Sequence, residues 1–441
     1  MLRRVGPLIV STDLVTRLSR RQFLAAGAAL PVLVTAACKP IERPPDMERP
    51  DAENESSPAP PLPTLRQRLG QMALVGFRGT SLETAPSAMT DVRDHAVGGV
   101  VLFTYDVARG DGVRNVVSPS QVAALTAALQ QTAHLPLIVA ADQEGGRVAR
   151  LDPARGFPAT YAAQHLGERG DPEFTYAQSH QMARTLKEAG VNHNFAPVVD
   201  VNTNPANPVI GSIGRSFSAE PAVVTEQAAA FIRGHRAVGV TTTLKHFPGH
   251  GSSRHDSHLG FVDVTDTWQE LELEPYRELI GRGLVDAVMT AHVFNAKLDP
   301  ELPATLSAPI LTGILREQLG FDGVVFSDDM QMAAIAAHYD FAEAVVLAVE
   351  AGVDVLTVGN NICLDRLVAA EIIDALEQAV LAGRIREERI NASYRRIMAL
   401  KAKWPRAQDN FQETRSGVVG ESVPGARLSR PALPARVWRG P

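Results

Sequence analysis

The sequence contains few cysteines and few aromatic residues. Two cysteines, Cys38 and Cys363, occur in 441 residues, so a disulfide framework and a multi-thiol metal site are excluded by count. No His or Asn motif of a cysteine nucleophile accompanies Cys363, which is predicted to be a packed or surface thiol. Aromatic residues make up 5% of the chain, which argues against a stacking surface for single-stranded nucleic acid.

The sequence also lacks an excess of positive charge. Its formal net charge is -6 at pH 7, which gives no reason to expect nucleic acid or an anionic membrane surface as a partner. Hydrophobic residues make up 45% and charged residues 21% of the chain, the usual balance of a soluble globular protein. The length is enough for one large domain with tails or for two ordinary domains.

The N-terminal segment has the composition of an export signal. Arg20 and Arg21 precede a moderately apolar stretch over 24–37, which is typical of twin-arginine export and is too short to span a bilayer permanently. Small residues precede Cys38, as at a bacterial lipoprotein cleavage site. We therefore expect an exported protein that is periplasmic or anchored to a membrane through a lipid on Cys38. The alternative is a short amphipathic leader.

Composition predicts four segments. The signal covers 1–38, and a proline-rich, charged segment over 39–63 is predicted to be a linker, because it cannot bury enough apolar surface to order itself. A folded domain is expected over 64–404. The segment 405–441 is rich in Arg, Pro, Gly and Ser without an apolar period, and we expect a loosely ordered tail.

Short apolar runs alternate with helical stretches through the predicted domain. The runs are 72–77, 98–103, 137–142, 194–201, 241–247, 287–293, 323–329 and 353–358. Their nearly continuous apolar character indicates parallel strands that are buried on both faces. The predicted helices are 119–132, 173–189, 222–237, 268–282, 308–319, 342–351, 372–382 and 387–403. Eight strands alternating with helices predict an α/β fold, a single (β/α)8 barrel of the TIM type.

A doubly wound open sheet is the alternative fold, but no Gly-x-Gly-x-x-Gly follows the first predicted strand, so its dinucleotide-binding version has no support. Ionisable residues close five of the runs, where a barrel places its active site. They are Asp142, Asp200, Lys245, His246, His292, Asp328 and Asp329. Such charges have a desolvation cost unless they are paired or functional. For Asp200 we expect a structural pairing across the rim.

The stretch 245–258 after the fifth run breaks at Pro248 and continues as a polar, glycine-containing loop. Asp256 and His258 are two residues apart, so a tight turn can bring the carboxylate to the imidazole and fix its tautomer. This makes His258 a candidate general acid/base. One alternative is a metal cluster of Asp256 with the loop histidines, His246, His250, His255 and His258. A solvated polar loop is the other.

The seventh run ends in Asp328 and Asp329. Because side chains alternate along a strand, we expect one of the two to face the mouth of the barrel, and spacing does not say which. A carboxylate opposite a proton donor is the arrangement that cleaves a glycoside through an oxocarbenium-like state. The sequence therefore favours a glycoside-cleaving site.

Three motifs, over 142–150, 245–258 and 326–330, together resemble the β-N-acetylglucosaminidases of glycoside hydrolase family 3. The resemblance covers about 64–404 and implies a nucleophile at Asp328, with His258 and Asp256 as an acid/base dyad. It also implies a set of substrate-binding residues, namely Asp142, Arg150, Arg215, Lys245 and His246. No cofactor and no metal are implied.

The chain departs from the family pattern in three ways. The stretch 210–214 before Arg215 is longer than in familiar members, which weakens that assignment. Many members carry a second domain after the barrel, whereas only a tail is expected here. Familiar single-barrel members act in the cytosol, whereas this chain carries an export signal.

The resemblance predicts a retaining exo-β-N-acetylhexosaminidase that removes terminal β-linked N-acetylglucosamine from cell-wall muropeptide fragments or chitooligosaccharides. Alternatives are a β-N-acetylglucosaminide phosphorylase, another β-glycosidase of the family such as a β-glucosidase, and an inactive sugar-binding lipoprotein. The Asp256–His258 loop argues against the β-glucosidase.

Overall fold

The computed structural model describes residues 62–110, 112–363 and 368–404. The predicted signal, nearly all of the predicted linker and the predicted tail lie outside the described residues. Within those residues, no helix combines the length and the apolar character that a membrane span requires.

Eight parallel strands form one sheet, in the order β10-β1-β2-β3-β6-β7-β8-β9. A parallel bridge between Phe326, in β9, and Val355, just before β10, joins the two ends of the sheet. The strands are β1 (Ala73–Gly76), β2 (Gly99–Leu102), β3 (Ile138–Ala141), β6 (His193–Asn194), β7 (Thr241–Phe247), β8 (Ala287–Thr290), β9 (Val324–Phe326) and β10 (Leu356–Val358). The predicted (β/α)8 barrel is confirmed.

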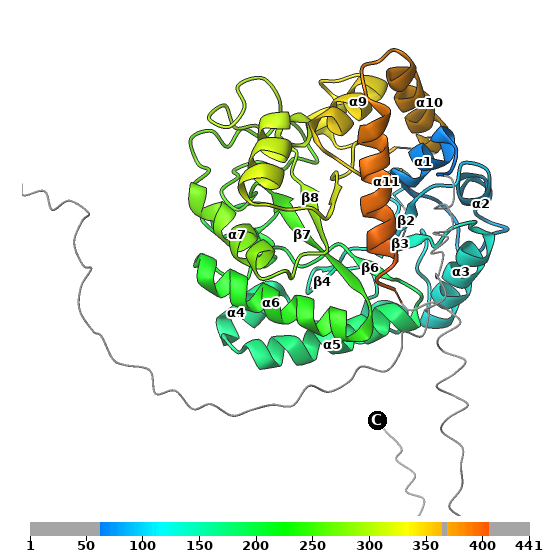
Figure 1. The fold of residues 1–441 in the computed structure, drawn as a ribbon. Coiled ribbons are helices and arrows are strands. Elements are labelled where there is room, and N and C mark those ends of the chain that lie inside the picture. The colour runs from blue at the N-terminus through cyan, green and yellow to red at the C-terminus, as the bar shows by residue number, and fades with distance from the viewer. Residues whose placement is uncertain (1–61, 111, 364–367, 405–441) are drawn as a thin grey trace, which may run out of the picture. The chain divides into compact units, whose positions relative to one another are not determined.

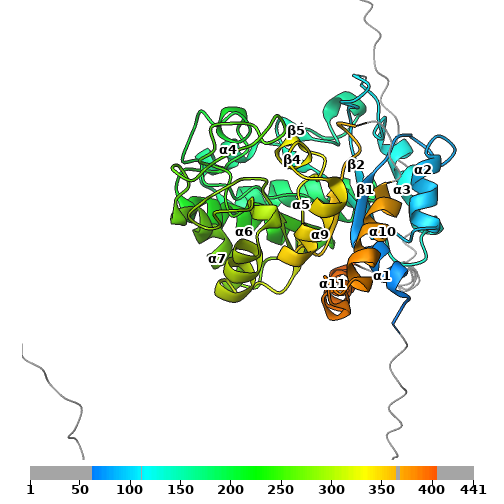
Figure 2. The same cartoon turned by 90° about the horizontal axis from the view of Figure 1, so that it is seen from above.

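Helices surround the barrel, as Figures 1 and 2 show from two directions. The longer ones are α1 (Leu65–Gln71), α2 (Pro86–Arg93), α3 (Pro119–Thr132), α5 (Pro172–Glu188), α6 (Pro221–Val238), α7 (Glu274–Gly281), the π-helix η5 (Pro309–Gln318), α9 (Phe341–Ala351), α10 (Val368–Leu381) and α11 (Glu387–Lys401). Shorter helical elements are α4 (Ala163–Arg169), α8 (Ala333–Ala336), η1 (Pro153–Arg155), η2 (Gly211–Ile213), η3 (Glu270–Leu273) and η4 (Ala304–Leu306).

Local sequence explains where several of these helices begin. Ser118 accepts a hydrogen bond from the amide of Gln121, and a proline follows it at the first position of α3. Asp171 caps α5 in the same way, again with a proline next in the chain. A hydroxyl or carboxylate at this position satisfies a free amide of the first turn, and proline has no amide to leave unsatisfied.

The observed elements differ from the predicted ones in three respects. The run predicted as a strand over 194–201 forms a regular strand only at its start, in β6, with one further parallel bridge between Val198 and Lys245. Pro197 lies between them and has no amide hydrogen to donate to a neighbouring strand. The helix predicted over 268–282 begins as the 3-10 turn η3 before α7, and that predicted over 308–319 is the π-helix η5. A hairpin of β4 (Gln143–Gly145) and β5 (Val148–Ala149) was not predicted.

Aromatic rings fill the barrel interior. Phe195 packs edge-on against Phe326, with ring centroids 5.4 Å apart. His193 lies 5.1 Å from the Phe326 ring, and its two ring nitrogens bond the hydroxyls of Thr241 and Thr243. Burial lowers the pKa of His193 to about 3, so this ring is a neutral part of the core.

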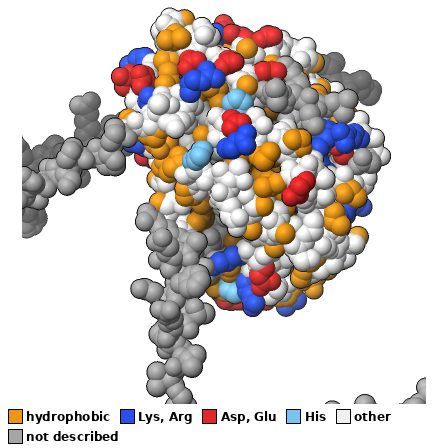
Figure 3. Space-filling model, turned by 90° about the vertical axis from the view of Figure 1, so that its right-hand side faces the viewer, with side chains coloured by type: hydrophobic (Ala, Val, Ile, Leu, Met, Phe, Trp, Pro, Cys, Tyr) orange, Lys and Arg blue, Asp and Glu red, His pale blue; other side chains and the backbone are white. Residues whose placement is uncertain are grey.

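The outer surface has no field of a single sign on the face shown in Figure 3. Lys and Arg side chains are interspersed there with Asp and Glu, and hydrophobic side chains are scattered among them. Cys363 is an exposed free thiol. Among the described residues, the concentration of charge that calls for explanation therefore lies at the mouth of the barrel.

Candidate active site

A cavity of about 480 Å³ opens at the carboxyl ends of the strands. Its volume is in the range of pockets that enclose small ligands. The structure brings all eight residues predicted for the site into its lining: Asp142, Arg150, Arg215, Lys245, His246, Asp256, His258 and Asp328. These residues come from β7 and from loops that are far apart in the sequence, so the barrel makes them neighbours.

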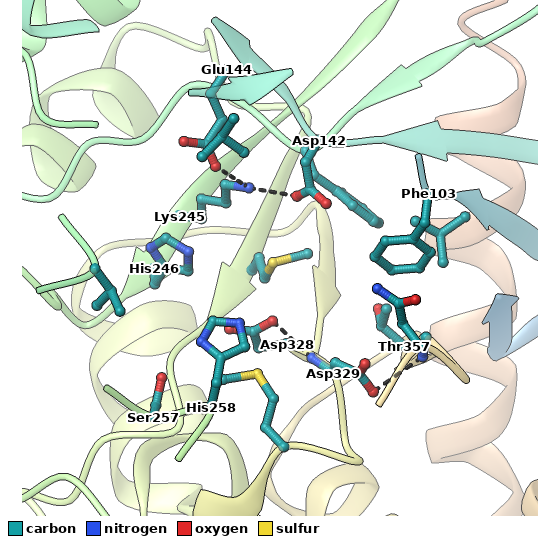
Figure 4. A pocket seen from close by; sticks show the side chains of 18 of the residues that line it. Phe103, Asp142, Glu144, Lys245, His246, Ser257, His258, Asp328, Asp329 and Thr357 are labelled. Atoms are coloured by element: carbon teal, nitrogen blue, oxygen red, sulfur yellow. Dashed lines mark hydrogen bonds and ion pairs between the residues drawn. The ribbon is translucent and has the colours of Figure 1, made fainter. Parts of the chain in front are cut away.

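Five side chains of alternating charge form one side of the cavity, which we call the polar wall. They are Arg150, Asp142, Lys245, Glu144 and Arg215. Arg150 donates to Asp142 at 2.9 Å, and Lys245 Nζ lies 2.8 Å from Asp142 Oδ1 and 2.7 Å from Glu144 Oε1. Arg215 donates to both Glu144 oxygens at 2.7 Å. Figure 4 shows Lys245 between the two carboxylates.

The charges of the polar wall keep its carboxylates ionised. Burial alone would raise the pKa of Glu144, but the charges of Arg215 and Lys245 outweigh it and lower that pKa to about 2. Burial likewise opposes ionisation of Asp142, and Lys245 and Arg150 hold its pKa far below the usual range. A bidentate arginine also fixes the carboxylate geometrically. The wall therefore presents fixed charges to a bound ligand.

Asp200 lies behind the cavity and positions His246. Its carboxylate accepts a hydrogen bond from His246 Nδ1 at 2.7 Å and another from the His246 amide at 3.1 Å. This leaves His246 Nε2 as an acceptor, 3.3 Å from Arg215 Nη2. Burial opposes ionisation of Asp200, but His246 and His250 hold its pKa below the usual range. The expected structural role of Asp200 agrees with these contacts.

Asp328 and Asp329 both line the cavity. Strand alternation, from which a single inward-facing aspartate was predicted, does not extend to them, because β9 ends at Phe326. The Asp329 carboxylate accepts hydrogen bonds from the amides of Gly359 and Gln331, at 3.1 and 3.0 Å. The Asp329 carboxylate therefore stabilises the turn that carries Asp328.

The two neighbouring carboxyls have opposite electrostatics. Burial raises the pKa of Asp329 to about 6. Burial also disfavours the charged form of Asp328, but His292, His246 and His258 hold its pKa below the usual range. Asp328 is therefore the more strongly ionised of the two carboxyls, and it lines the cavity without the Gly359 and Gln331 hydrogen bonds that hold Asp329.

His258 and Asp256 form a pair at the mouth. Asp256 Oδ1 accepts hydrogen bonds from His258 Nδ1 at 2.7 Å and from the His258 amide at 2.8 Å. Since an ionised carboxylate only accepts, Nδ1 carries the hydrogen and Nε2 is free for a ligand. The His258 side chain is 55% exposed. Figure 4 shows its ring beside Asp328.

A family model described as the glycosyl hydrolase family 3 N terminal domain matches residues 64–400. The chain belongs to glycosyl hydrolase family 3. It is 34% identical over 391 residues to beta-hexosaminidase A of Pseudoalteromonas piscicida, covering 78% of this chain and 62% of that protein. It is 40% identical over 301 residues to a beta-hexosaminidase of Xylella fastidiosa (strain M23), covering 65% and 83%.

Among solved structures, this family 3 chain is similar to a glycoside hydrolase family 3 beta-N-acetylglucosaminidase from Paenibacillus sp. str. FPU-7. The TM-score is 0.71 at 39% identity, covering 84% of this chain and 66% of that one. The family 3 chain thus spans less than two thirds of the length of that protein and of the Pseudoalteromonas relative.

Sequence reasoning missed several cavity residues of this family 3 chain. Glu144 lay inside a quoted motif, but nothing in its spacing showed that it would hold both Lys245 and Arg215. Phe103 closes the second apolar run, and its ring lies 5.4 Å from the Arg150 guanidinium. Thr357, in β10, also lines the cavity. Phe103 is apolar and Thr357 is neutral, so neither residue stood out from its strand as a candidate site residue in the sequence.

The histidines of the loop after β7 separate in the structure. His250 is buried, with Nε2 3.1 Å from the Ser257 hydroxyl, whereas His255 is exposed and does not line the cavity. In the part of the chain that the structure describes, no group of three or more His, Cys, Asp or Glu side chains is arranged to hold a metal ion.

Proposed function

We propose that this chain is a retaining exo-β-N-acetylhexosaminidase, which removes terminal β-linked N-acetylglucosamine through a covalent glycosyl-enzyme. One observation carries the proposal. An ionised carboxylate, Asp328, and a carboxylate-bound imidazole, His258, line the same cavity. These are the two groups needed for displacement at an anomeric carbon with proton transfer to the leaving oxygen. The names of the Pseudoalteromonas, Xylella and Paenibacillus relatives support the choice of sugar.

The chemistry follows from the two groups. The Asp328 carboxylate attacks the anomeric carbon as His258, in its imidazolium form, donates the Nε2 proton to the departing oxygen and becomes neutral. His258 then removes a proton from water, which displaces Asp328 and leaves the product with its original configuration. Asp256 bonds Nδ1–H of the imidazole throughout and stabilises the imidazolium form.

The polar wall supports recognition of a polar ring. Asp142 offers carboxylate oxygens to sugar hydroxyls, while Lys245, His246 and Arg150 supply further polar atoms around it. Arg215 borders the same space through its pairing with Glu144. Because burial and mutual ion pairs already fix these groups, little reorganisation is needed when the sugar binds.

We further propose that the protein is exported and acts on muropeptide fragments or chitooligosaccharides outside the cytoplasm. The twin arginine and the small residues before Cys38 support this location. Replacing Arg20 and Arg21 by lysine is expected to retain the protein in the cytoplasm, as measured by fractionation. Unchanged export of that variant would contradict the proposal, and mass spectrometry of the N-terminus decides whether Cys38 carries lipid.

The activity is tested with aryl β-N-acetylglucosaminide and aryl β-glucoside, each with and without phosphate. We expect turnover of the first substrate, release of the β-anomer of free sugar, and the same product in phosphate buffer. Formation of the sugar 1-phosphate would identify a phosphorylase, which an imidazole acid/base favours because it repels phosphate less than a carboxylate does. A preference for the glucoside, or binding without turnover, would contradict the proposal.

A further inference from the structure

Glu272 is a buried carboxylate that does not line the cavity. It belongs to η3, and its side chain is fully buried. It lies beneath residues 248–253, which we call the loop base; these connect β7 to the exposed arm, residues 254–261. Every residue of the loop base is buried, whereas most of the arm is exposed.

Glu272 bonds the loop base directly. Its Oε2 accepts a hydrogen bond from the Gly251 amide at 3.1 Å, and its Oε1 faces the Gln269 amide at 3.4 Å, so the side chain ties the loop to the start of η3. Gly249 lies against the same side chain with a φ of 126°. A β-carbon there would come within 2.7 Å of Glu272 Cβ, so only glycine permits this approach.

A second acid holds the loop base from the other side. Asp200 accepts the His250 amide at 2.8 Å, next to the amide that Glu272 holds. The ionisable groups that face Glu272 are therefore Asp200 and, from α7, the Tyr276 phenol. Neither is a cation, and burial followed by the charge of Asp200 raises the pKa of Glu272 to about 7. Glu272 completes a capping box with Gln269 at the start of η3, and its hydrogen bond to Gly251 extends that contact to the loop base.

We propose that Glu272 is a positioning residue for the acid/base arm: by holding the Gly251 amide, it sets where the arm leaves the loop base and so brings His258 to the cavity. This inference rests on the proposed function, because it assigns Glu272 to the proton-transfer half of that reaction. The arm has few fixed contacts of its own. One is the amide of Ala334, 3.3 Å from the Ser257 carbonyl.

The test compares Glu272→Leu, which has similar bulk and no acceptor, with Glu272→Gln, which keeps one. Two aryl β-N-acetylglucosaminides are used: dinitrophenyl, which departs without a proton, and methoxyphenyl, which needs one. Glu272→Leu is expected to lower kcat/KM for methoxyphenyl about 10- to 100-fold and to leave dinitrophenyl within about threefold. Azide, which attacks without a base, is expected to raise kcat for dinitrophenyl. Glu272→Gln is expected to show the same pattern at about 3- to 10-fold.

Two reference variants separate the possible failures. His258→Ala defines the pattern for complete loss of the acid/base, and Glu274→Leu, at an exposed position of α7, is expected to behave as wild type. If His258→Ala lacks the pattern, the proposed function fails. If His258→Ala shows it but both Glu272 variants are unchanged, or lose both substrates equally without an azide response, the inference about Glu272 alone is overturned.

Discussion

The polar wall has a buried centre and is cross-linked by ion pairs, whereas most of the arm across the cavity is exposed. Lys245, at the centre of the wall, is 2% exposed, but the His258 side chain is 55% exposed and the neighbouring Leu259 is 82% exposed. Lys245 lies in β7 and Asp142 directly after β3, where the barrel sheet fixes the backbone, and the two arginines are held by ion pairs to the wall carboxylates. The arm is held at Ser257 and Phe261, whereas His258 and Leu259 between them are exposed.

This contrast indicates that sugar recognition and proton transfer depend on different parts of the fold. A side chain in the wall cannot be lost without leaving a buried charge, so its removal affects stability as well as binding. The His258 side chain on the arm is largely exposed, so its removal is expected to affect chemistry much more than stability. Asp328 lies between the two regions and is needed whichever holds the substrate.

The largest effect is expected from Asp328→Asn. The amide cannot form the covalent intermediate, so kcat on aryl β-N-acetylglucosaminide is expected to fall roughly 10³- to 10⁵-fold. Circular dichroism and thermal unfolding should remain close to wild type, since the change is nearly isosteric. Asp329→Asn is the matched control, because the Asp329 carboxyl accepts hydrogen bonds from backbone amides and is not the proposed nucleophile. Near-normal turnover by Asp328→Asn would remove the nucleophile from the account.

His258→Ala tests whether the arm contributes to catalysis without contributing to stability. Turnover of substrates with poor leaving groups is expected to fall about 10²- to 10⁴-fold, because general-acid assistance is lost. The free energy of unfolding should change by less than about 0.5 kcal/mol, since the side chain is largely exposed. Urea unfolding measures this, and destabilisation by several kcal/mol would erase the difference between arm and wall.

Lys245→Met tests the contribution of the polar wall to stability and to substrate binding. Removing the ammonium leaves Asp142 and Glu144 each with one arginine partner but facing each other without the central cation. The free energy of unfolding is expected to fall by about 3 kcal/mol, and KM should rise. Both carboxylates have lowered pKa values in the native protein, so the wall stabilises the fold above their ordinary pKa values and loses this contribution in acid. A Lys245→Met variant with wild-type stability at neutral pH would contradict the wall's role.

The smallest effect concerns the junction between the two regions. Folding raises the pKa of Glu272 from 4.5 to about 7, so the folded state holds this proton more tightly than the unfolded state. The resulting stability is present below pH 4.5 and is lost as pH rises through 7. Glu272→Gln does not titrate, so between pH 5 and pH 8 its stability should improve relative to wild type by on the order of 2 kcal/mol. Urea unfolding at both pH values measures this, and an unchanged difference would contradict it.

The sequence was sufficient for the barrel and for most of the ionisable residues of its cavity. Strands buried on both faces are nearly continuous in apolar residues, so a charge at the end of a run, such as Asp142 or Lys245, stands out. The pairing of Asp256 with His258 followed from a spacing of two residues. Both are local signals, and the barrel converts them into neighbours.

Contacts between distant segments could not be predicted. Glu144 meets Arg215 across 71 positions of sequence, and Glu272 meets Gly251 across 21. Neither glutamate interrupts an apolar run in a way that marks it. β6 is shorter than its apolar run because Pro197 limits pairing. The prediction of one continuous strand did not take this proline into account. These features depend on tertiary placement, which periodicity does not report.

The most direct test is to trap the intermediate. A fluorinated N-acetylglucosaminyl substrate with an activated leaving group slows hydrolysis of the covalent species, and mass spectrometry of the digested protein locates the sugar. We expect one sugar bound through an ester to Asp328, with slower release in His258→Ala than in wild type. Labelling of another carboxylate, or inversion of the anomeric configuration in the product, would contradict the account.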